Sequence, residues 1–212
     1  MICGIDEAGK GSVLGPMVIG GVKGESLSDF TNSGYNDSKK ISAKKRDEFF
    51  EDISKNYETT CIILDANRID ECRITYSMND IVAMAHAKAI DKLAPKKAYV
   101  DACDVNEVRY GLSVKEHLKN PVEIISEHKA DEKFRIVSAA SIIAKVTRDR
   151  LIENISEEYG KIGSGYPSDP VTIEFLKSYI KENGEPPVFS RKSWKTVSNV
   201  IGNIQQKTLF EF

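Results

Sequence analysis

The chain has 212 residues, of which 41% are hydrophobic and 29% are charged, and its formal net charge at pH 7 is −2. This mix is typical of a soluble globular protein with one main domain and a sizeable core. The near-zero charge excludes a global basic field, so contacts with nucleic acid have to use local patches. Apolar runs fall short of the roughly 20 residues that a membrane span needs, and Asp6 comes too early for a secretory signal peptide. We therefore expect a cytoplasmic protein without membrane contact.

The first third of the chain predicts two paired strands, a helix and a third strand. Residues 1–8 and 15–23 are apolar and flank a glycine-rich turn, which predicts a hairpin. A helix is predicted over residues 43–55, with Ser42 as its N-cap and an apolar stripe on one face. The run TTCIILDA, residues 59–66, predicts the next strand.

Helices and strands alternate along the rest of the chain. The stretch Ser77-Met78-Asn79-Asp80 resembles a capping box and opens a predicted helix. The later predicted elements are strands over residues 98–102 and 122–127, and helices over residues 105–119, 138–159, 170–183 and 193–205. This order predicts an α/β fold in which helices cover a mixed sheet, followed by a helical C-terminal region.

Carboxylates stand where several predicted strands end. Asp6 and Glu7 are adjacent, and because strand side chains alternate between faces, they cannot both face solvent from a half-buried strand. Asp101 ends the strand AYVDA, and Asp131 follows VEIISE. Ligand sites gather outside strand ends, and clustered carboxylates suit a hard cation such as Mg²⁺. Spacing alone leaves two interpretations open, a two-metal site for phosphoryl chemistry or unrelated strand-end acids.

Cysteine and histidine usage argues against zinc and against a disulfide framework. The four cysteines form no C-x-x-C pair, and the three histidines are scattered. His86 lies in an apolar helical stretch, and we interpret it as a core histidine. Any metal is therefore expected to be held by carboxylates.

Six motifs, in order, resemble those of the ribonuclease HII family, the type 2 ribonucleases H. They cover most of the chain and read GIDEAGKGSVLGPMVIGGV, DSKKIS, AYVDACD, HKADEKFRIVSAASIIAKVTRDR, GSGYPSDP and RKSWKT. The last two forms look most like archaeal members. Lys10 departs from the arginine that is commoner in the family's loop, and lysine can contact a phosphate but cannot make a bidentate contact.

The resemblance implies a ribonuclease H-like fold, in which helices flank a five-stranded mixed sheet. It implies that Asp6, Glu7, Asp101 and Asp131 are the catalytic residues and bind Mg²⁺ or Mn²⁺. Asp104 is the second candidate for the third acid, because the sequence DACD offers two. Its position past the strand end makes it the lesser candidate.

The implied activity is that of an endoribonuclease. It would cleave the RNA strand of RNA/DNA hybrids and single ribonucleotides embedded in duplex DNA, by a two-metal mechanism that leaves 5′-phosphate and 3′-hydroxyl ends. In the family, the loop Gly9-Lys10-Gly11 and a tyrosine, here Tyr166, read the ribonucleotide, which only its 2′-hydroxyl distinguishes locally from a deoxyribonucleotide. Without the resemblance, we would interpret Tyr166 as a packed loop residue.

Polar and basic side chains supply further candidates for substrate contacts. They are Lys39, Lys40, Ser141, Lys145, Arg148 and Arg191. Ser141, Lys145 and Arg148 are spaced by four and three residues, so they share one face of the long helix. The alternative is a solvated helix face, and we interpret Trp194, beside Arg191, as a core residue.

The C-terminal residues resemble a sliding-clamp-binding motif. Gln206, Leu209 and Phe212 have the spacing of that motif, although Glu211 separates the two phenylalanines that would normally be adjacent. A short helical turn would place Leu209 and Phe212 on one face, able to fill an apolar pocket of a clamp. The alternative is that these residues fold back as core.

The expected organisation is a ribonuclease H-like catalytic core over residues 1–160, a helical region over 161–205 and a candidate clamp-binding tail over 206–212. We expect a monomer that acts in DNA replication or ribonucleotide repair. One alternative is a metal-dependent DNA nuclease or resolvase of the same superfamily, which would cut an all-DNA duplex equally well. A second is a non-catalytic nucleic-acid-binding module, against which the complete set of four acids argues.

Overall fold

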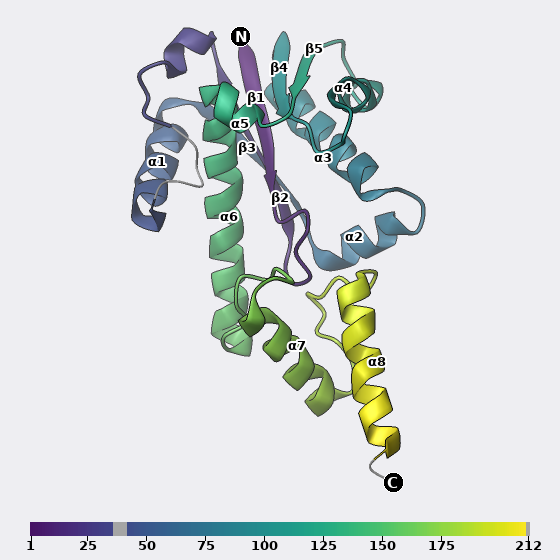
Figure 1. Ribbon diagram of the computed structural model, residues 1–212. Coiled ribbons are helices and arrows are strands. Elements are labelled where there is room, and N and C mark those ends of the chain that lie inside the picture. Colours follow the sequence, from purple (N-terminus) through teal and green to yellow (C-terminus); the bar gives the residue numbers. More distant parts are fainter. Residues whose placement is uncertain (36–41, 211–212) are drawn as a thin grey trace. The chain divides into compact units, whose positions relative to one another are not determined.

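The structure is a computed structural model that describes residues 1–35 and 42–210, with side chains as far as residue 204 (Figure 1). The chain divides into two compact units, and each is described by itself. Unit 1 consists of Met1–Ala8, Val18–Ile63 and Ser77–Thr147, and unit 2 consists of Gly9–Met17, Leu64–Tyr76 and Arg148–Phe212. The division into residues 1–160, 161–205 and 206–212 stays a prediction. No helix in the described ranges is long and apolar enough to cross a membrane.

Unit 1 is built on a five-stranded mixed sheet. Its strands are β1 (Ile2–Ala8), β2 (Met17–Gly24), β3 (Glu58–Leu64), β4 (Lys97–Asp101) and β5 (Glu123–Glu127). The spatial order is β3-β2-β1-β4-β5. β1 pairs with β2 in antiparallel fashion, as the hairpin prediction requires, while β1, β4 and β5 run parallel. The predicted mixed sheet is therefore confirmed.

One face of the sheet is covered by α6 (Arg135–Tyr159), which packs directly on glycines (Figure 1). A Cβ atom at Gly4 would lie 2.4 Å from the Ile136 carbonyl oxygen, and one at Gly20 would lie 2.3 Å from that of Ala140. Only glycine fits these places, so the helix lies closer to β1 and β2 than side chains would allow. Ile53 of helix α1 (Ala43–Asn56) belongs to the same hydrophobic core cluster as Ile136 and Ala140 of α6.

The opposite face carries α3 (Met78–Leu93), and α4 (Glu107–Glu116) packs on α3 and β5. The predicted capping box of α3 is confirmed, because Asp80 N–H donates to Ser77 Oγ at 3.2 Å and Ser77 N–H donates to Asp80 Oδ2 at 3.1 Å. These contacts satisfy N–H groups that the first turn of a helix leaves unpaired. The cap thereby fixes where α3 begins.

Unit 2 has its own core, to which the C-terminal part of α6, α7 (Pro170–Asn183) and α8 (Lys195–Phe210) contribute. Its buried apolar residues are Val13, Leu14, Ile152, Ile162, Leu176, Ile180, Val197 and Val200, and Trp194 packs against them as predicted. Pro170 at the first turn, Asp169 as N-cap and Gly184 beyond the last turn explain the bounds of α7.

The structure adds short elements that the sequence patterns did not predict. They are a 3₁₀ turn η1 (Leu27–Phe30), α2 (Ala66–Arg73) and α5 (Ala130–Lys133). Asp65, taken as the end of a strand, is instead the N-cap of α2 and accepts a hydrogen bond from Arg68 N–H at 2.7 Å. The long helix also begins at Arg135 rather than at about Ser138.

Candidate active site

The predicted acids of unit 1 gather where three parallel strands end. Ile5 of β1 pairs with Val100 of β4, so Asp6 and Asp101 occupy the next position along the two strands. Asp131 lies on α5, shortly after the end of β5. Parallel strands share a carboxyl edge, where ligands bind in open sheets. The structure therefore brings these acids to one edge of the sheet.

Asp6 and Glu7 point to opposite faces of the sheet, which accounts for two adjacent carboxylates in one strand. Asp6 is on the same face of β1 as Gly4, and the buried Ser141 of α6 donates a hydrogen bond to it. Glu7 is on the face of α3, where its Oε2 lies 3.2 Å from Nε2 of His86. Both side chains therefore find polar partners on the helices that cover the sheet.

His86 is a residue of this site that the sequence analysis missed. Its ring is fully buried, and Nδ1 lies 3.0 Å from the hydroxyl of Tyr110. The contact between Nε2 and Glu7 Oε2 has ion-pair distance without hydrogen-bond alignment, so within the described residues Oε2 accepts no hydrogen bond. No short-range pattern could reveal this contact, because His86 and Glu7 are far apart in sequence.

Burial and the charges of neighbouring carboxylates disfavour ionisation of Asp6 and Asp101. Burial, followed by the charges of Glu7 and Asp101, raises the pKa of Asp6 well above its usual range. Burial likewise raises the pKa of Asp101 to about 6, with Glu7 and Asp131 adding to the effect. A hydrogen bond of 2.7 Å from Ala130 N–H to Asp101 Oδ1 opposes it only in part. Asp6, Glu7, Asp101 and Asp131 are called the acid cluster below.

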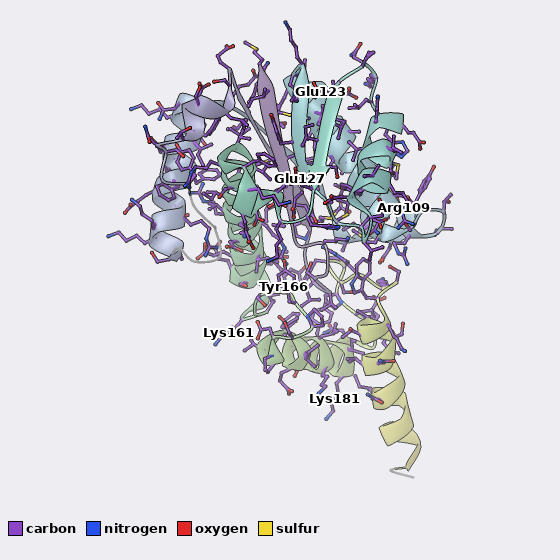
Figure 2. All side chains as sticks on the ribbon, turned by 45° about the horizontal axis from the view of Figure 1, so that its top comes forward. Arg109, Glu123, Glu127, Lys161, Tyr166 and Lys181 are labelled. Atoms are coloured by element: carbon purple, nitrogen blue, oxygen red, sulfur yellow. The ribbon has the colours of Figure 1, made fainter. Side chains whose placement is uncertain are left out.

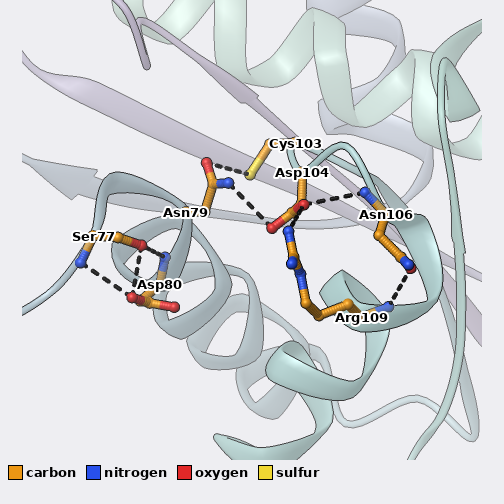
Figure 3. A network of polar contacts seen from close by, with 7 residues as sticks. All are labelled: Ser77, Asn79, Asp80, Cys103, Asp104, Asn106 and Arg109. Atoms are coloured by element: carbon orange, nitrogen blue, oxygen red, sulfur yellow. Dashed lines mark hydrogen bonds and ion pairs between the residues drawn. The ribbon is translucent and has the colours of Figure 1, made fainter.

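Asp104 lies in a different environment, although it is only three residues from Asp101 (Figure 3). Arg109 pairs with Oδ1, Asn106 N–H donates to the same oxygen at 3.1 Å, and Asn79 Nδ2 donates to Oδ2 at 3.2 Å. These contacts, above all the one from Arg109, lower the pKa of Asp104. Its charge is therefore neutralised by its neighbours, which favours Asp101 as the third acid.

The acid cluster fits a hard divalent cation by its chemistry. As the side chains stand, no three His, Cys, Asp or Glu in the described part of the chain converge tightly enough to bind one ion. Even so, burial and neighbouring carboxylates raise the pKa of Asp6 and of Asp101, and Glu7 Oε2 is buried without a hydrogen-bond donor among the described residues. Oxygen ligands and excess negative charge are what Mg²⁺ requires.

In unit 2, the loop Gly9-Lys10-Gly11 and Tyr166 are brought together. Gly9 has a φ of +83°, which favours glycine, and its N–H donates to the Tyr166 hydroxyl at 3.0 Å. Tyr166, labelled in Figure 2, belongs to the segment between α6 and α7. Lys10 is half-buried, and Gly11 is exposed. The two parts named by the resemblance are therefore in contact, although 157 residues separate them.

The structure places the predicted phosphate contacts in different environments, and their contacts with substrate stay predictions. Arg148 and Arg191 do not belong to a solvated surface, because they are buried and their guanidinium groups donate to backbone carbonyls. Ser141 is buried too and serves Asp6, while Lys145 is half-buried. Helical spacing gave the shared face, but it could not tell a buried face from a solvated one.

Other predicted residues are not covered by the structural description. Lys39, Lys40 and Phe212 lie outside the described residues, as do the side chains of Gln206 and Leu209. Their predicted roles stay predictions.

Comparisons with known proteins agree with the geometry. The profile of the family Ribonuclease HII matches residues 3–197. A ribonuclease HII of Methanoregula boonei is 51% identical over 212 residues, which is 100% of both chains. The crystal structure of ribonuclease H2 from Pyrococcus horikoshii OT3 superposes with a TM-score of 0.89 at 39% identity, covering 97% of this chain and 99% of that one. The PCNA:RNase HII complex from Archaeoglobus fulgidus gives 0.86 at 42%, covering 92% and 95%.

A mixed sheet of this strand order, flanked by helices, defines a ribonuclease H-like protein. The full-length matches narrow this class, and the chain belongs to the ribonuclease HII family. It is accordingly a type 2 ribonuclease H, an enzyme that cleaves the RNA strand of RNA/DNA hybrids and depends on divalent metal ions.

Proposed function

We propose that this enzyme also cleaves duplex DNA at single embedded ribonucleotides, using two divalent cations, Mg²⁺ or Mn²⁺, held by Asp6, Glu7, Asp101 and Asp131. The observation that carries the metal assignment is the mutual repulsion of buried carboxylates at the shared edge of β1, β4 and β5. Carboxylates that raise the pKa of buried Asp6 and Asp101 are costly to bring together, and cations would offset that cost.

The residues of the acid cluster act as ligands and orienting groups. Ser141 holds the Asp6 carboxylate, Ala130 N–H holds that of Asp101, and Glu7 lies against His86. When bound, the two cations would activate the attacking water and stabilise the leaving oxygen, so no covalent intermediate with the protein is needed. Attack by water on the phosphorus would leave a 5′-phosphate and a 3′-hydroxyl.

The loop Gly9-Lys10-Gly11 and Tyr166 are proposed to read the ribonucleotide. The 2′-hydroxyl is the only local difference between RNA and DNA, and glycines allow backbone N–H groups to approach a sugar closely. The hydrogen bond from Gly9 N–H to the Tyr166 hydroxyl supports a joint role for the loop and the tyrosine. Lys10, Lys39, Lys40 and Lys145 are proposed to contact phosphates.

The decisive experiment uses a DNA duplex that carries one ribonucleotide. With Mg²⁺ or Mn²⁺, we expect cleavage of the phosphodiester bond on the 5′ side of the ribonucleotide. The product ends should be a 5′-phosphate and a 3′-hydroxyl, and EDTA should abolish cleavage. An all-DNA duplex of the same sequence is the matched control. Equal cutting of both duplexes would instead favour a DNA nuclease or resolvase, and cleavage of long hybrids alone would reject the embedded-ribonucleotide activity.

The tail is proposed to recruit the enzyme to a sliding clamp, and thereby to replication and ribonucleotide repair. The similarity to a protein whose structure is that of a PCNA:RNase HII complex supports such a partner. The test is to delete residues 206–212 and to measure clamp binding and cleavage of a short substrate. The proposal expects loss of clamp binding with cleavage retained. Retained clamp binding would refute it, and a loss of folding would support the core alternative.

We propose that the enzyme itself is a monomer.

A further inference from the structure

Two arginines of unit 2 are buried. Arg191 is 0% and Arg148 is 3% exposed. Neither guanidinium group forms an ion pair with a carboxylate among the residues the structure describes. Burial lowers the pKa of both, that of Arg191 to about 9, with the charge of Arg148 adding to the effect. Buried unpaired charges are costly, and a fold tends to retain such features for function.

Arg191 binds the loop Gly9-Lys10-Gly11 through consecutive carbonyl groups. Its Nη2 donates to the Gly9 oxygen at 2.6 Å, and its Nη1 donates to the Lys10 oxygen at 2.8 Å. Nε and Nη2 also reach the Gly15 oxygen, at 3.3 and 3.2 Å. The ring of Trp194 lies against the guanidinium group, 5.0 Å from its central carbon. The rigid, planar guanidinium group of Arg191 therefore binds three backbone carbonyls, those of Gly9, Lys10 and Gly15.

This arrangement fixes the direction of the loop's N–H groups. In a trans peptide unit, the C=O and N–H bonds point in opposite directions. Because Arg191 binds the carbonyls of Gly9 and Lys10, the N–H groups of Lys10 and Gly11, which belong to the same two peptide units, point away from the guanidinium group. Gly11 is exposed, and no atom lies within 4 Å of where its Cβ would be. The N–H groups of Lys10 and Gly11 therefore point to the side opposite Arg191, and the exposed Gly11 N–H is suited to a sugar hydroxyl or a phosphate oxygen.

Arg148 packs against Tyr166, the second element that is proposed to recognise the ribonucleotide. Its guanidinium group lies against the Tyr166 ring, 4.8 Å from the ring centre, and Nη2 donates to the Ser164 oxygen at 3.1 Å. Nε donates to the Pro16 oxygen at 3.1 Å. A Cβ atom at Gly9 would lie 2.3 Å from Arg148 Nε, so the glycine is required for this packing. Arg148 therefore joins the segment of Tyr166 to Gly9 and to Pro16.

We propose that Arg191 and Arg148 are positioning residues for ribonucleotide recognition: Arg191 orients the N–H groups of Lys10 and Gly11, and Arg148 orients Tyr166. This inference rests on the proposed reading of the ribonucleotide by the loop and Tyr166. Neither arginine touches substrate, and both act through the groups that do. Their unneutralised charges also make the loop region attractive to phosphate.

The test compares Arg191→Lys, Arg191→Met and Arg148→Met with a control, Arg150→Met, which changes an exposed arginine on the same helix as Arg148. For each full-length variant, kcat and KM are measured on a duplex with one ribonucleotide and on a long RNA/DNA hybrid. Mn²⁺ binding to the acid cluster is measured by calorimetry on the same samples, together with melting temperature. Arg191→Lys keeps the charge but cannot bridge three carbonyls, so it separates geometry from charge.

We expect kcat on the single ribonucleotide to fall about 10–100-fold in the Arg191 and Arg148 variants, because misplaced contact groups cost rate at that scale. The loss on the long hybrid should be smaller, and Mn²⁺ affinity should match the wild type. Arg148→Met combined with Tyr166→Ala should be no worse than Tyr166→Ala alone, since both changes act on one contact.

Equal losses on both substrates together with weakened Mn²⁺ binding would show a merely structural role and overturn the inference, as would rates that match Arg150→Met. If Arg191→Met does not fold, Arg191→Lys decides by the same criteria. If Tyr166→Ala selectively impairs the single-ribonucleotide substrate while the arginine variants do not, the inference alone fails. If Tyr166→Ala has no selective effect either, the proposed reading of the ribonucleotide fails with it.

Discussion

The buried acids of unit 1 and the buried arginines of unit 2 carry opposite charges and are satisfied in opposite ways. The arginines donate hydrogen bonds to backbone carbonyls of their own unit. Burial and neighbouring carboxylates raise the pKa of Asp6 and of Asp101, and among the described residues Glu7 Oε2 accepts no hydrogen bond. The difference indicates two functions for buried charge. The arginines bind backbone carbonyls, whereas the acids are proposed to bind cations.

Asp104 is a carboxylate of unit 1 whose charge is balanced by partners within the protein, so it can be compared directly with Asp101. Its contacts to Arg109, Asn106 and Asn79 lower its pKa, while burial raises that of Asp101 (Figure 3). Adjacency in sequence does not assign a catalytic acid, but the electrostatic environment does. Asp104→Asn is consequently a matched control for Asp101→Asn.

The largest effect is expected from Asp6→Asn or Asp101→Asn. Loss of a charged ligand should lower kcat by more than about 100-fold, since even partners of metal ligands are worth 10–100-fold. Binding of an RNA/DNA hybrid should persist, because phosphate contacts do not depend on these carboxylates. Single-turnover cleavage and a gel-shift assay measure the two quantities. Asp104→Asn should retain wild-type cleavage, and wild-type rates for Asp101→Asn at saturating Mg²⁺ would reject its assignment.

A smaller and more selective effect is expected from Tyr166→Ala. The change removes the acceptor of Gly9 N–H and the ring that lies against Arg148. Cleavage at a single embedded ribonucleotide should fall about 10-fold or more, and cleavage of a long hybrid should fall less, because a hybrid offers many registers. Tyr166→Phe separates the hydroxyl from the ring. A uniform loss on both substrates would assign the tyrosine to structure.

The electrostatics of the acid cluster predict a pH-dependent stability. A carboxyl whose pKa rises from 3.8 to about 6 on folding binds its proton more tightly in the folded state. The resulting stabilisation is present below pH 3.8 and is lost as the pH rises through about 6. In EDTA at pH 8, Asp101→Asn should therefore raise the melting temperature by roughly 2–4 °C, the effect of about 1 kcal/mol in a chain of this size.

The same measurement has two internal controls. At pH 4 the difference between Asp101→Asn and the wild type should vanish, because the wild-type carboxyl is then protonated. At pH 8, Mg²⁺ should stabilise the wild type more than the variant, since a ligand that binds only the folded state raises its stability. A variant that is less stable than the wild type in EDTA at pH 8 would contradict the repulsion inferred for the cluster.

The smallest effect is expected from Lys145→Met. If this half-buried lysine contacts a phosphate, its loss should weaken hybrid binding for all sequences and reduce the salt slope by about one. Binding measured across a salt series gives the slope directly. An unchanged slope would return Lys145 to the interpretation of a solvated helix face.

The sequence patterns predicted most of the fold because local rules govern its elements. Capping residues such as Ser42 and Ser77 begin α1 and α3 as expected, and alternating apolar runs form the strands. The helix α2 was missed because Asp65 ends a strand-like run and also caps a helix, and only the tertiary structure decides between the two. The parallel edge of β1, β4 and β5 followed from the alternation of strands and helices.

The site was less accessible to sequence reasoning, for reasons that concern contact partners. The family resemblance supplied the four acids and the loop, whereas Arg148 and Arg191 were predicted only as phosphate contacts, without their contacts to the loop. Their partners are backbone carbonyls, which leave no trace in a sequence. His86 is buried as predicted, but the sequence could not show that its Nε2 lies 3.2 Å from Glu7 Oε2.

The most direct test of the central claim is Mn²⁺ binding to the protein without nucleic acid, measured by titration calorimetry for the wild type, Asp101→Asn and Asp104→Asn. The account predicts binding to the wild type, strongly weakened binding to Asp101→Asn and unchanged binding to Asp104→Asn, because only Asp101 belongs to the acid cluster that repels itself. Equal binding to Asp101→Asn and the wild type, or a loss confined to Asp104→Asn, would contradict the assignment of the metal site.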